Sequence, residues 1–315
     1  RFVGHHLARA CMERGHDLTL FHRGQTSVGA YPGARDVIGD REDGLAALDG
    51  ESFDAAIDTC AYVPRIAGAA AKELKGRVGH YTFVSTVSIY ADFSQPGLHE
   101  DSDVVHLEDE TVEEITGETY GGLKVLCERV VNEHLGDRTF HLRPGIIIGP
   151  NDPTDRFTYW VERMARGGEV LAPTPPGRTM QGVDARDLAT FTLERIEAGF
   201  VGPRNVAGPS TTFADMLAAC AEGAGTDSSI RWADSDRLEA LEVQFPKELP
   251  FWLPKPEYAG FGLVDSSRAR SEGLQHRPIA ETARDTLKWL RTRPANHEWL
   301  AGLSAERERD LLQRL

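Results

Sequence analysis

Cysteines and long apolar runs are both scarce in this sequence, and their scarcity excludes several classes of protein. Among its 315 residues are four cysteines without a Cys-x-x-Cys pair: Cys11, Cys60, Cys127 and Cys220. This spacing argues against a disulfide framework and a zinc site, so we expect no metal and a reducing, cytoplasmic location. No run of about 18 apolar residues is present, so no helix is expected to span a membrane.

Positive charge is also in short supply. Lys and Arg number 35 against 49 Asp and Glu, which gives a net charge of −14. A surface of this sign repels phosphate backbones and anionic lipids, so we expect neither a nucleic acid nor a membrane as partner. A local basic pocket for a small anion is compatible with this charge. The 40% of hydrophobic and 27% of charged residues are typical of a soluble globular protein.

The first 150 residues alternate between strand-like and helix-like segments. Apolar runs predict strands at residues 18–21, 36–38, 53–58, 80–86 and 139–148, and helical periodicity predicts helices at residues 2–14, 65–74 and 118–135. Strands separated by single helices pair in parallel through right-handed crossovers. The sequence therefore predicts an α/β fold with a Rossmann-type doubly wound parallel sheet over residues 1–150.

The pattern changes after residue 150. Helices are predicted at residues 156–165, 187–197, 213–221, 280–290 and 304–315, with Asp187 and Ser304 as N-caps. Residues 231–262 are irregular and rich in aromatic side chains. We therefore expect residues 151–315 to form mainly a small C-terminal substrate-binding cap domain, with some segments returning to the Rossmann sheet.

The sequence opens directly on a predicted helix, with no strand before it. A doubly wound sheet has its first strand in the centre, so we expect this strand to be missing and the sequence to begin partway through the gene product. A protein that began at Arg1 would lack half of a phosphate-binding loop, and we expect such a form to bind a dinucleotide poorly.

Tyr120 and Lys124 form the sharpest local motif. Residues i and i+4 of a helix share one face, so the phenol and the ammonium point into the same space. A nearby cation lowers the pKa of a phenol, which makes Tyr120 a candidate general acid/base for a hydroxyl proton. Such a pair also arises by chance, but Thr86 ends the strand just upstream, at the sheet edge where ligands bind, and would bond the reacting oxygen.

Residues near the beginning of the sequence suggest a dinucleotide site. Gly4 opens the first helix, where a glycine lets a pyrophosphate approach the backbone. After the next strand, the position that usually carries an acid for the ribose 2′-hydroxyl holds His22 and Arg23. A cationic pair suits a 2′-phosphate, so we expect NADP, with NAD as the alternative. The competing interpretation is a solvated loop arginine.

Together these landmarks resemble the extended short-chain dehydrogenases/reductases, in the NAD-dependent epimerase/dehydratase family. The resemblance covers essentially the full length, and its motifs occur in the family's order: Arg1-Phe-Val-Gly4, Gly39-Asp40-Arg41, Asp58-Thr-Cys60, Ser85-Thr86, Tyr120-x-x-x-Lys124, Leu142-Arg-Pro-Gly145 with Gly149-Pro150, and Gln181-x-Val-Asp184-x-x-Asp187. It implies a Rossmann fold, a tightly held nicotinamide cofactor and hydride transfer at a carbinol carbon.

The same resemblance implies a role for each matched position. Tyr120 would be the catalytic acid/base, Lys124 would bind the nicotinamide ribose and lower the tyrosine pKa, and Thr86 would be the catalytic Ser/Thr. The cofactor would contact a larger set of residues: Arg1, Phe2, Val3, Gly4, His22, Arg23, Asp40, Arg41, Cys60, Ala61, Pro144 and Gly145.

One departure from the family pattern concerns the substrate. Nucleotide-sugar members usually have Asn after the Arg-x-x stretch, where this sequence has Ile146, which favours a less charged substrate. In the segment that should roof the pocket, Arg156 is predicted to hold a substrate oxyanion, and Tyr159 or Trp160 to stack on a substrate ring. The alternative is that these aromatic residues pack the domain junction.

We therefore expect an NAD(P)-dependent oxidoreductase that transfers hydride at a carbinol or carbonyl carbon of a small molecule, with a reductase preferred. Two alternatives stay open. One is a nucleotide-sugar epimerase of the UDP-glucose 4-epimerase type, which shows no net cofactor turnover. The other is a non-catalytic nucleotide-sensing or RNA-binding protein on the same fold. A homodimer is expected by analogy alone.

Overall fold

The computed structural model describes residues 2–25 and 28–315. Its central sheet is parallel and has four strands in the order β3-β4-β5-β9: β3 (Phe53–Asp58), β4 (Val78–Val84), β5 (Thr139–Pro144) and β9 (Gly202–Val206). A separate parallel pair consists of β1 (Thr19–His22) and β2 (Arg35–Ile38). The predicted α/β architecture is confirmed. That a first strand precedes Arg1 in the gene product stays a prediction.

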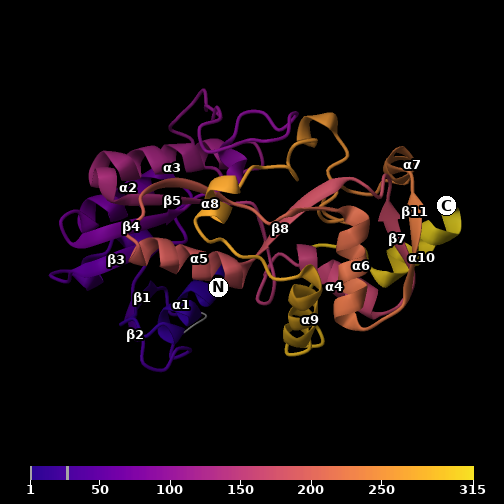
Figure 1. Cartoon of the computed structure of the whole chain (residues 1–315), viewed down its shortest axis with the longest axis horizontal. Coiled ribbons are helices and arrows are strands. Elements are labelled where there is room, and N and C mark those ends of the chain that lie inside the picture. Colours follow the sequence, from indigo (N-terminus) through magenta and orange to yellow (C-terminus); the bar gives the residue numbers. More distant parts are fainter. Residues whose placement is uncertain (1, 26–27) are drawn as a thin grey trace.

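Helices cover both faces of the central sheet (Figure 1). On one face α2 (Pro64–Leu74) packs against α3 (Tyr120–Leu135), and on the other α1 (Phe2–Glu13) packs against α5 (Ala185–Glu197). The two helical layers bury separate apolar clusters, in which Phe83 and Phe140 of the sheet are both fully buried. Apolar runs without polar alternation predict such a doubly covered parallel sheet.

The predicted strand over residues 139–148 is interrupted at Gly145, which is a correction to the sequence prediction. A Cβ atom on Gly145 would lie 3.1 Å from the Cβ atom of Ala207, so a larger residue here would require the neighbouring chain to shift by a few tenths of an ångström. Beyond this point β6 (Ile146–Ile148) leaves β5 and joins a different sheet, with the order β10-β8-β6. The added strands are β8 (Thr179–Asp184) and β10 (Ser210–Thr212).

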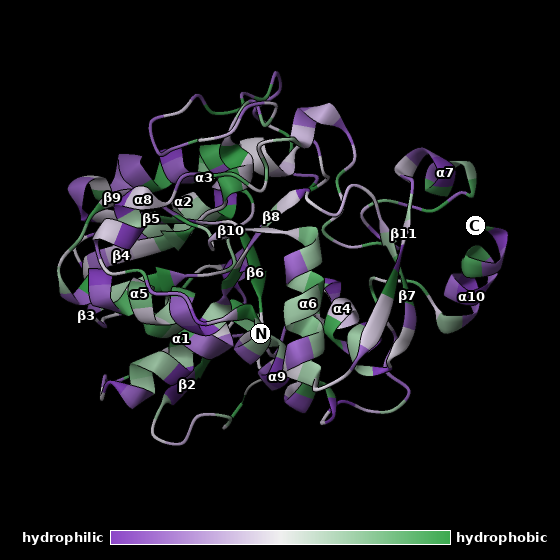
Figure 2. Ribbon diagram, turned by 45° about the vertical axis from the view of Figure 1, so that its right-hand side comes forward, coloured by the Kyte–Doolittle hydropathy of each residue, from purple (hydrophilic) through white to green (hydrophobic). Residues whose placement is uncertain are grey.

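Strand β6 connects the central sheet to a second core. Its side chains alternate: Ile147 packs with the sheet cluster, whereas Ile146 and Ile148 pack with the second cluster. Figure 2 shows this apolar strand between the sheet and the helices of the second part. In the second core the ring of Phe213 lies 5.2 Å from that of Trp160 and 5.4 Å from that of Trp252, both edge-on. The predicted domain boundary at residue 150 stays a prediction.

Most of the remaining elements surround this second core: α4 (Arg156–Ala165), β7 (Gly168–Pro173), α6 (Phe213–Ala224), β11 (Ser228–Ala233), α7 (Ser235–Ala240), α9 (Ile279–Leu290) and α10 (Ala305–Arg314). The short helix α8 (Ser267–Ser271) packs instead against β9, and its Ala269 is buried in the core of the central sheet. Strands β7 and β11 pair in parallel. In the described part of the chain, no helix has the length and apolar character needed to cross a bilayer.

Two predicted N-caps have different outcomes. The hydroxyl of Ser304 accepts the backbone N–H of Arg307, so the predicted cap of α10 is confirmed. The prediction for Asp187 is wrong, because α5 begins earlier and Asp184 caps it by accepting the N–H of Arg186 at 2.8 Å. Asp187 instead accepts two side-chain hydrogen bonds from Arg277. A second acid one turn away made the start of the helix ambiguous in the sequence.

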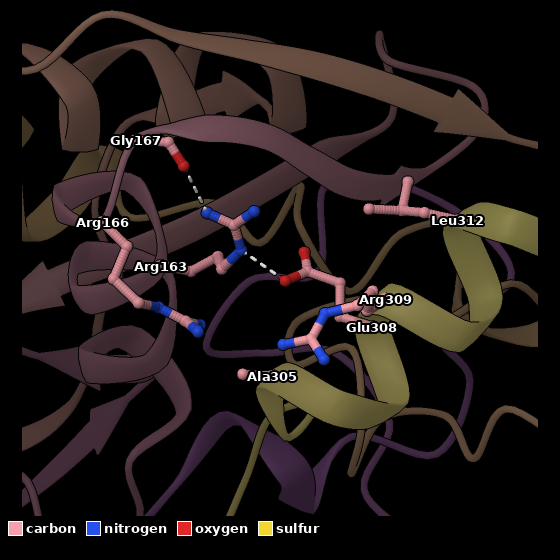
Figure 3. Close-up of a pocket in the computed structure, with 7 residues that line it drawn as sticks. All are labelled: Arg163, Arg166, Gly167, Ala305, Glu308, Arg309 and Leu312. Atoms are coloured by element: carbon pink, nitrogen blue, oxygen red, sulfur yellow. Dashed lines mark hydrogen bonds and ion pairs between the residues drawn. The ribbon is translucent and has the colours of Figure 1, made fainter.

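A buried ion pair fastens α10 to the second core (Figure 3). Glu308 accepts from Arg163 of α4 at 2.5 Å and from the backbone N–H of Leu171 in β7 at 3.1 Å. The two charged side chains are 5% and 7% exposed. Arg163 also donates to the carbonyl oxygen of Gly167, so one guanidinium joins α4, the start of β7 and α10.

Candidate active site

The carboxyl ends of three neighbouring strands carry the segments that the sequence singled out. Cys60 and Ala61 follow β3, Thr86 follows β4, and Pro144 and Gly145 end β5. Because these strands are parallel, the three segments lie at one edge of the sheet. In open α/β sheets the crevice outside this edge is where ligands bind.

Lys124 ties two of these strand ends together. Its ammonium donates to the carbonyl oxygens of Ala61 at 2.9 Å and Val84 at 2.7 Å, and its side chain is buried. The nitrogen lies 4.0 Å from the ring centroid of Phe83 and 5.5 Å from that of Tyr62. Burial lowers the pKa of Lys124 to about 8. The ammonium is therefore held by backbone dipoles and aromatic faces at the edge of the sheet.

Tyr120 begins α3, one helical turn before Lys124, and is partly buried. Burial raises its pKa, and a hydrogen bond with Thr86 and the charge of Arg156 oppose this effect without cancelling it. The hydroxyl of Thr86, which also accepts the N–H of Ser88, therefore lies near the phenol, and the phenol is within range of the charge of Arg156. The predicted net lowering of the tyrosine pKa is not found, because burial has the larger effect.

Tyr62 is a member of the site that the sequence analysis missed. Its side chain is 45% exposed, and its ring centroid lies 6.4 Å from that of Tyr120. Its ring lies over the ammonium of Lys124, as that of Phe83 does at shorter distance. The available signal was an aromatic residue directly after Cys60 and Ala61, at the end of a predicted strand.

The start of α1 approaches the same edge of the sheet. A Cβ atom on Gly4 would lie 3.6 Å from the hydroxyl oxygen of Thr59, which follows β3. Val3 packs with the sheet core, and Phe2 lies in the first turn of the helix. Arg1 lies outside the described residues. A glycine where a helix begins beside a strand end fits the close approach of a pyrophosphate.

Two exposed apolar side chains lie at the last residue of β2 and in the connection between β1 and β2. Ile38 is 53% exposed and Val28 is 61% exposed. Between them, a Cβ atom on Gly24 would lie 3.4 Å from Ile38 and 3.8 Å from Val28. An apolar surface beside Asp40, one of the predicted cofactor contacts, fits a flat heteroaromatic ring.

The predicted cationic pair is only partly present. The Nδ1 atom of His22 accepts the N–H of Gly24, so its Nε2 atom donates to Asp36 at 2.9 Å. A carboxylate therefore faces the ring of His22, whereas Arg23 is exposed. The carboxylate of Asp40 accepts the N–H of Glu42 and caps η1 (Arg41–Asp43).

Arg41 lies in a buried network below the site. It donates to both carboxylate oxygens of Asp58, which is 5% exposed, and to the carbonyl oxygen of Ile66. The hydroxyl of Tyr81 donates to the same carboxylate at 2.8 Å. Burial alone would raise the pKa of Asp58. The charge of Arg41 and these hydrogen bonds have the larger effect, so the pKa lies below its ordinary value. The cofactor contact predicted for Arg41 is untested, and its visible role is to hold η1 against β3.

The two residues predicted to contact substrate lie in different environments. Arg156 is half-buried at the start of α4. Tyr159 is 2% exposed, and its ring packs edge-on against Trp160 and directly on the backbone of Gly302, where a Cβ atom would be 2.0 Å from the ring. Tyr159 and Trp160 thus lie in the second core, as the packing alternative described, and substrate contact by Tyr159 would require this core to open.

No family model matches the sequence, and no curated protein is similar to it. Solved structures are similar in fold. UDP-N-acetylglucosamine 4-epimerase from Bacillus cereus has a TM-score of 0.70 at 14% identity, with 95% of this chain and 96% of that chain covered. The enzyme of that name from Methanobrevibacter ruminantium M1, in complex with UDP-N-acetylmuramic acid, has a TM-score of 0.69 at 16% identity, with 92% and 95% covered.

UDP-glucuronic acid 4-epimerase from Bacillus cereus, in complex with NAD, has a TM-score of 0.65 at 13% identity, with 92% of this chain and 95% of that chain covered. These similarities extend over almost the whole of each chain and pass through both the sheet and the second core. At the level of the fold, the resemblance predicted from the motifs is therefore confirmed: the chain has the Rossmann-type fold of the NAD-dependent UDP-sugar 4-epimerases.

Proposed function

We propose that this protein is an NAD(P)-dependent enzyme that acts at a carbinol carbon of a small molecule, by epimerisation rather than net reduction. The observation that carries this proposal is the position of Thr86, Tyr120 and Lys124 at the carboxyl edge of the parallel sheet. The names of the structural neighbours support the epimerase alternative over the preferred reductase. The homodimer expected by analogy is untested.

The chain's own residues divide the proton chemistry between them. A bound nicotinamide cofactor would supply the hydride acceptor. Tyr120 takes the hydroxyl proton of the substrate, and Thr86 aligns the reacting oxygen by a hydrogen bond. Without a cofactor, burial raises the pKa of Tyr120, so the phenol keeps its proton at neutral pH and is not yet a base. A positive charge bound beside the phenol would lower this pKa and favour the phenolate.

Three features of the described chain would hold the cofactor. The backbone around Gly4 would accept the pyrophosphate, and the apolar pair Val28 and Ile38 would face the adenine. At the ribose, Arg23 favours NADP, whereas the carboxylate of Asp36 on His22 favours NAD. Titration of the protein with each dinucleotide, followed by calorimetry, will rank the two.

Replacement of Tyr120 by Phe tests the proposal. We expect turnover to fall by roughly 10²–10⁴-fold, because a general acid/base contributes about this factor, while dinucleotide binding is retained. The assay follows conversion of UDP-sugars by chromatography and NADPH or NADH absorbance in parallel. Conversion without a change in absorbance supports epimerisation.

The matched control is Tyr258→Phe on the exposed η5 (Pro256–Tyr258). Unchanged turnover in Tyr120→Phe, or binding of neither dinucleotide, would overturn the proposal.

A further inference from the structure

Arg156 makes no ion pair with a carboxylate of the described chain, although acids flank it in the sequence. The nearest, Asp155, is 0% exposed and is fully engaged elsewhere. Its two oxygens accept from Arg293 at 2.5 Å, from His297 at 2.9 Å and from the backbone N–H of Leu300 at 3.0 Å. The charge of Asp155 is therefore neutralised by residues that follow α9, and not by its neighbour Arg156.

A second acid, Asp152, is connected to Arg156 only indirectly, through the hydroxyl of Thr154. Asp152 is 1% exposed, and its carboxylate accepts the hydroxyl of Thr154 at 2.7 Å and its N–H at 2.9 Å. Because the single hydroxyl proton of Thr154 goes to Asp152, the oxygen is left to accept from Nε of Arg156, at 3.0 Å. The hydrogen bond to Thr154 fixes the orientation of the guanidinium. Within the described residues, its two Nη groups have no hydrogen-bond acceptor and can bind a ligand.

The charge of Arg156 acts at the reactive phenol. It is one of the effects that lower the pKa of Tyr120, and Arg156 lies at the first position of α4, after the loop that leaves β6. A half-buried cation without a carboxylate in contact is unfavourable unless something else pairs with it. The two Nη groups of arginine form a planar fork that matches a carboxylate or a phosphate.

We propose that Arg156 binds an anionic group of the substrate, a carboxylate or a phosphate, and that Thr154 and Asp152 are the residues that position it. The inference rests on the proposed function, because it names the substrate class of the same site. It is compatible with Ile146, since one anionic group needs less support than a diphosphate. The single acceptor at Nε makes the geometry dependent on the hydroxyl of Thr154.

The test follows the Nε–Hε signal of Arg156 by NMR in the full chain, with the signal assigned from its loss in Arg156→Lys. Inorganic phosphate and acetate are titrated separately at matched ionic strength, with chloride as the reference anion. We expect a saturable shift with phosphate or acetate and none with chloride. The anion that binds more tightly identifies the source of the charge. The same titration of Thr154→Val should show binding weaker by roughly tenfold, because a hydrogen bond to a charged group is lost.

Thr154→Ser is the matched control, since it retains the hydroxyl and should retain the native affinity. Equal shifts with chloride, or no response to either anion, would overturn anion binding at Arg156. Unchanged affinity in Thr154→Val would overturn the positioning role. Dinucleotide titration of the same variants reports the proposed function and the integrity of the fold. Dinucleotide binding without an anion response thus rejects this inference alone, whereas an anion response without dinucleotide binding rejects the proposed function.

Discussion

At the residue scale, Lys124 is a cation whose side chain is almost completely buried. Two strand carbonyls accept from it and two aromatic rings cover it, yet burial still lowers its pKa to about 8 from 10.5. Dipoles and ring faces thus replace only part of the lost hydration. A group whose pKa differs between the folded and unfolded states makes stability depend on pH.

For Lys124 the dependence has a definite sign. Between pH values of about 8 and 10.5 the unfolded chain keeps this proton and the folded chain has lost it, so the free energy of unfolding rises with pH in this interval. Relative to Lys124→Met, which lacks the proton, the native protein should gain about 3 kcal/mol across it. Urea denaturation of both proteins at several pH values measures the difference. Parallel pH profiles would show that the lysine titrates normally.

At the scale of elements, Asp184 does more than cap a helix. It is 3% exposed and accepts the N–H of Arg186, two side-chain hydrogen bonds from that arginine, and the hydroxyl of Thr282 in α9. The carboxylate thereby joins the start of α5 to α9. Thr212, by contrast, caps α6 through local hydrogen bonds only, to Asp215.

The two caps should therefore differ in their contribution to stability. Asp184→Ala is expected to lower the free energy of unfolding by about 3 kcal/mol, because it removes the cap, the hydrogen bond from Thr282 and the carboxylate contacts of Arg186. Arg186 keeps its pair with Asp285. Thr212→Ala, the control, should cost about 1 kcal/mol. Urea denaturation of both variants gives the values. Equal losses would mean that the link between α5 and α9 adds nothing to the cap.

Elements with a local signal were predictable from the sequence, and those that depend on distant partners were not. The amphipathic α4 was predicted with its observed bounds, and β3 likewise, because periodicity and apolar runs are local. Strands β7 and β11 were missed because each is defined by pairing with the other, across two intervening helices and three strands. In the site, Tyr120 and Lys124 stood out by spacing, but the acceptors of Lys124 lie 63 and 40 residues away and no pattern marks them.

At the scale of the whole molecule, single ion pairs connect segments that are far apart in the chain. Arg163 and Glu308 are separated by 145 residues, and their pair is the buried contact between α4 and α10 shown in Figure 3. Removal of one partner from a buried pair leaves the other charge without compensation.

Glu308→Gln should consequently destabilise the second core by roughly 3 kcal/mol, even though the amide oxygen still accepts from Leu171. Hydrogen exchange of the α10 amides is expected to accelerate more than that of the central sheet, because the loss is local. Glu306→Gln, on the exposed side of the same helix, should change stability by less than about 1 kcal/mol. The role assigned to the pair fails if both variants behave alike.

The hydrogen bonds that Arg293 and His297 donate to Asp155 have a consequence for the order in which the parts of the protein fold during synthesis. The residues that hold this carboxylate, Arg293 and His297, follow it by 138 and 142 positions. Synthesis proceeds from the amino end, and domains fold as they emerge. On the ribosome, the sheet with Tyr120 and Lys124 therefore has time to form while Asp155 still lacks these two hydrogen-bond donors. The buried carboxylate at the start of α4 gains its side-chain partners only when these late residues leave the exit tunnel.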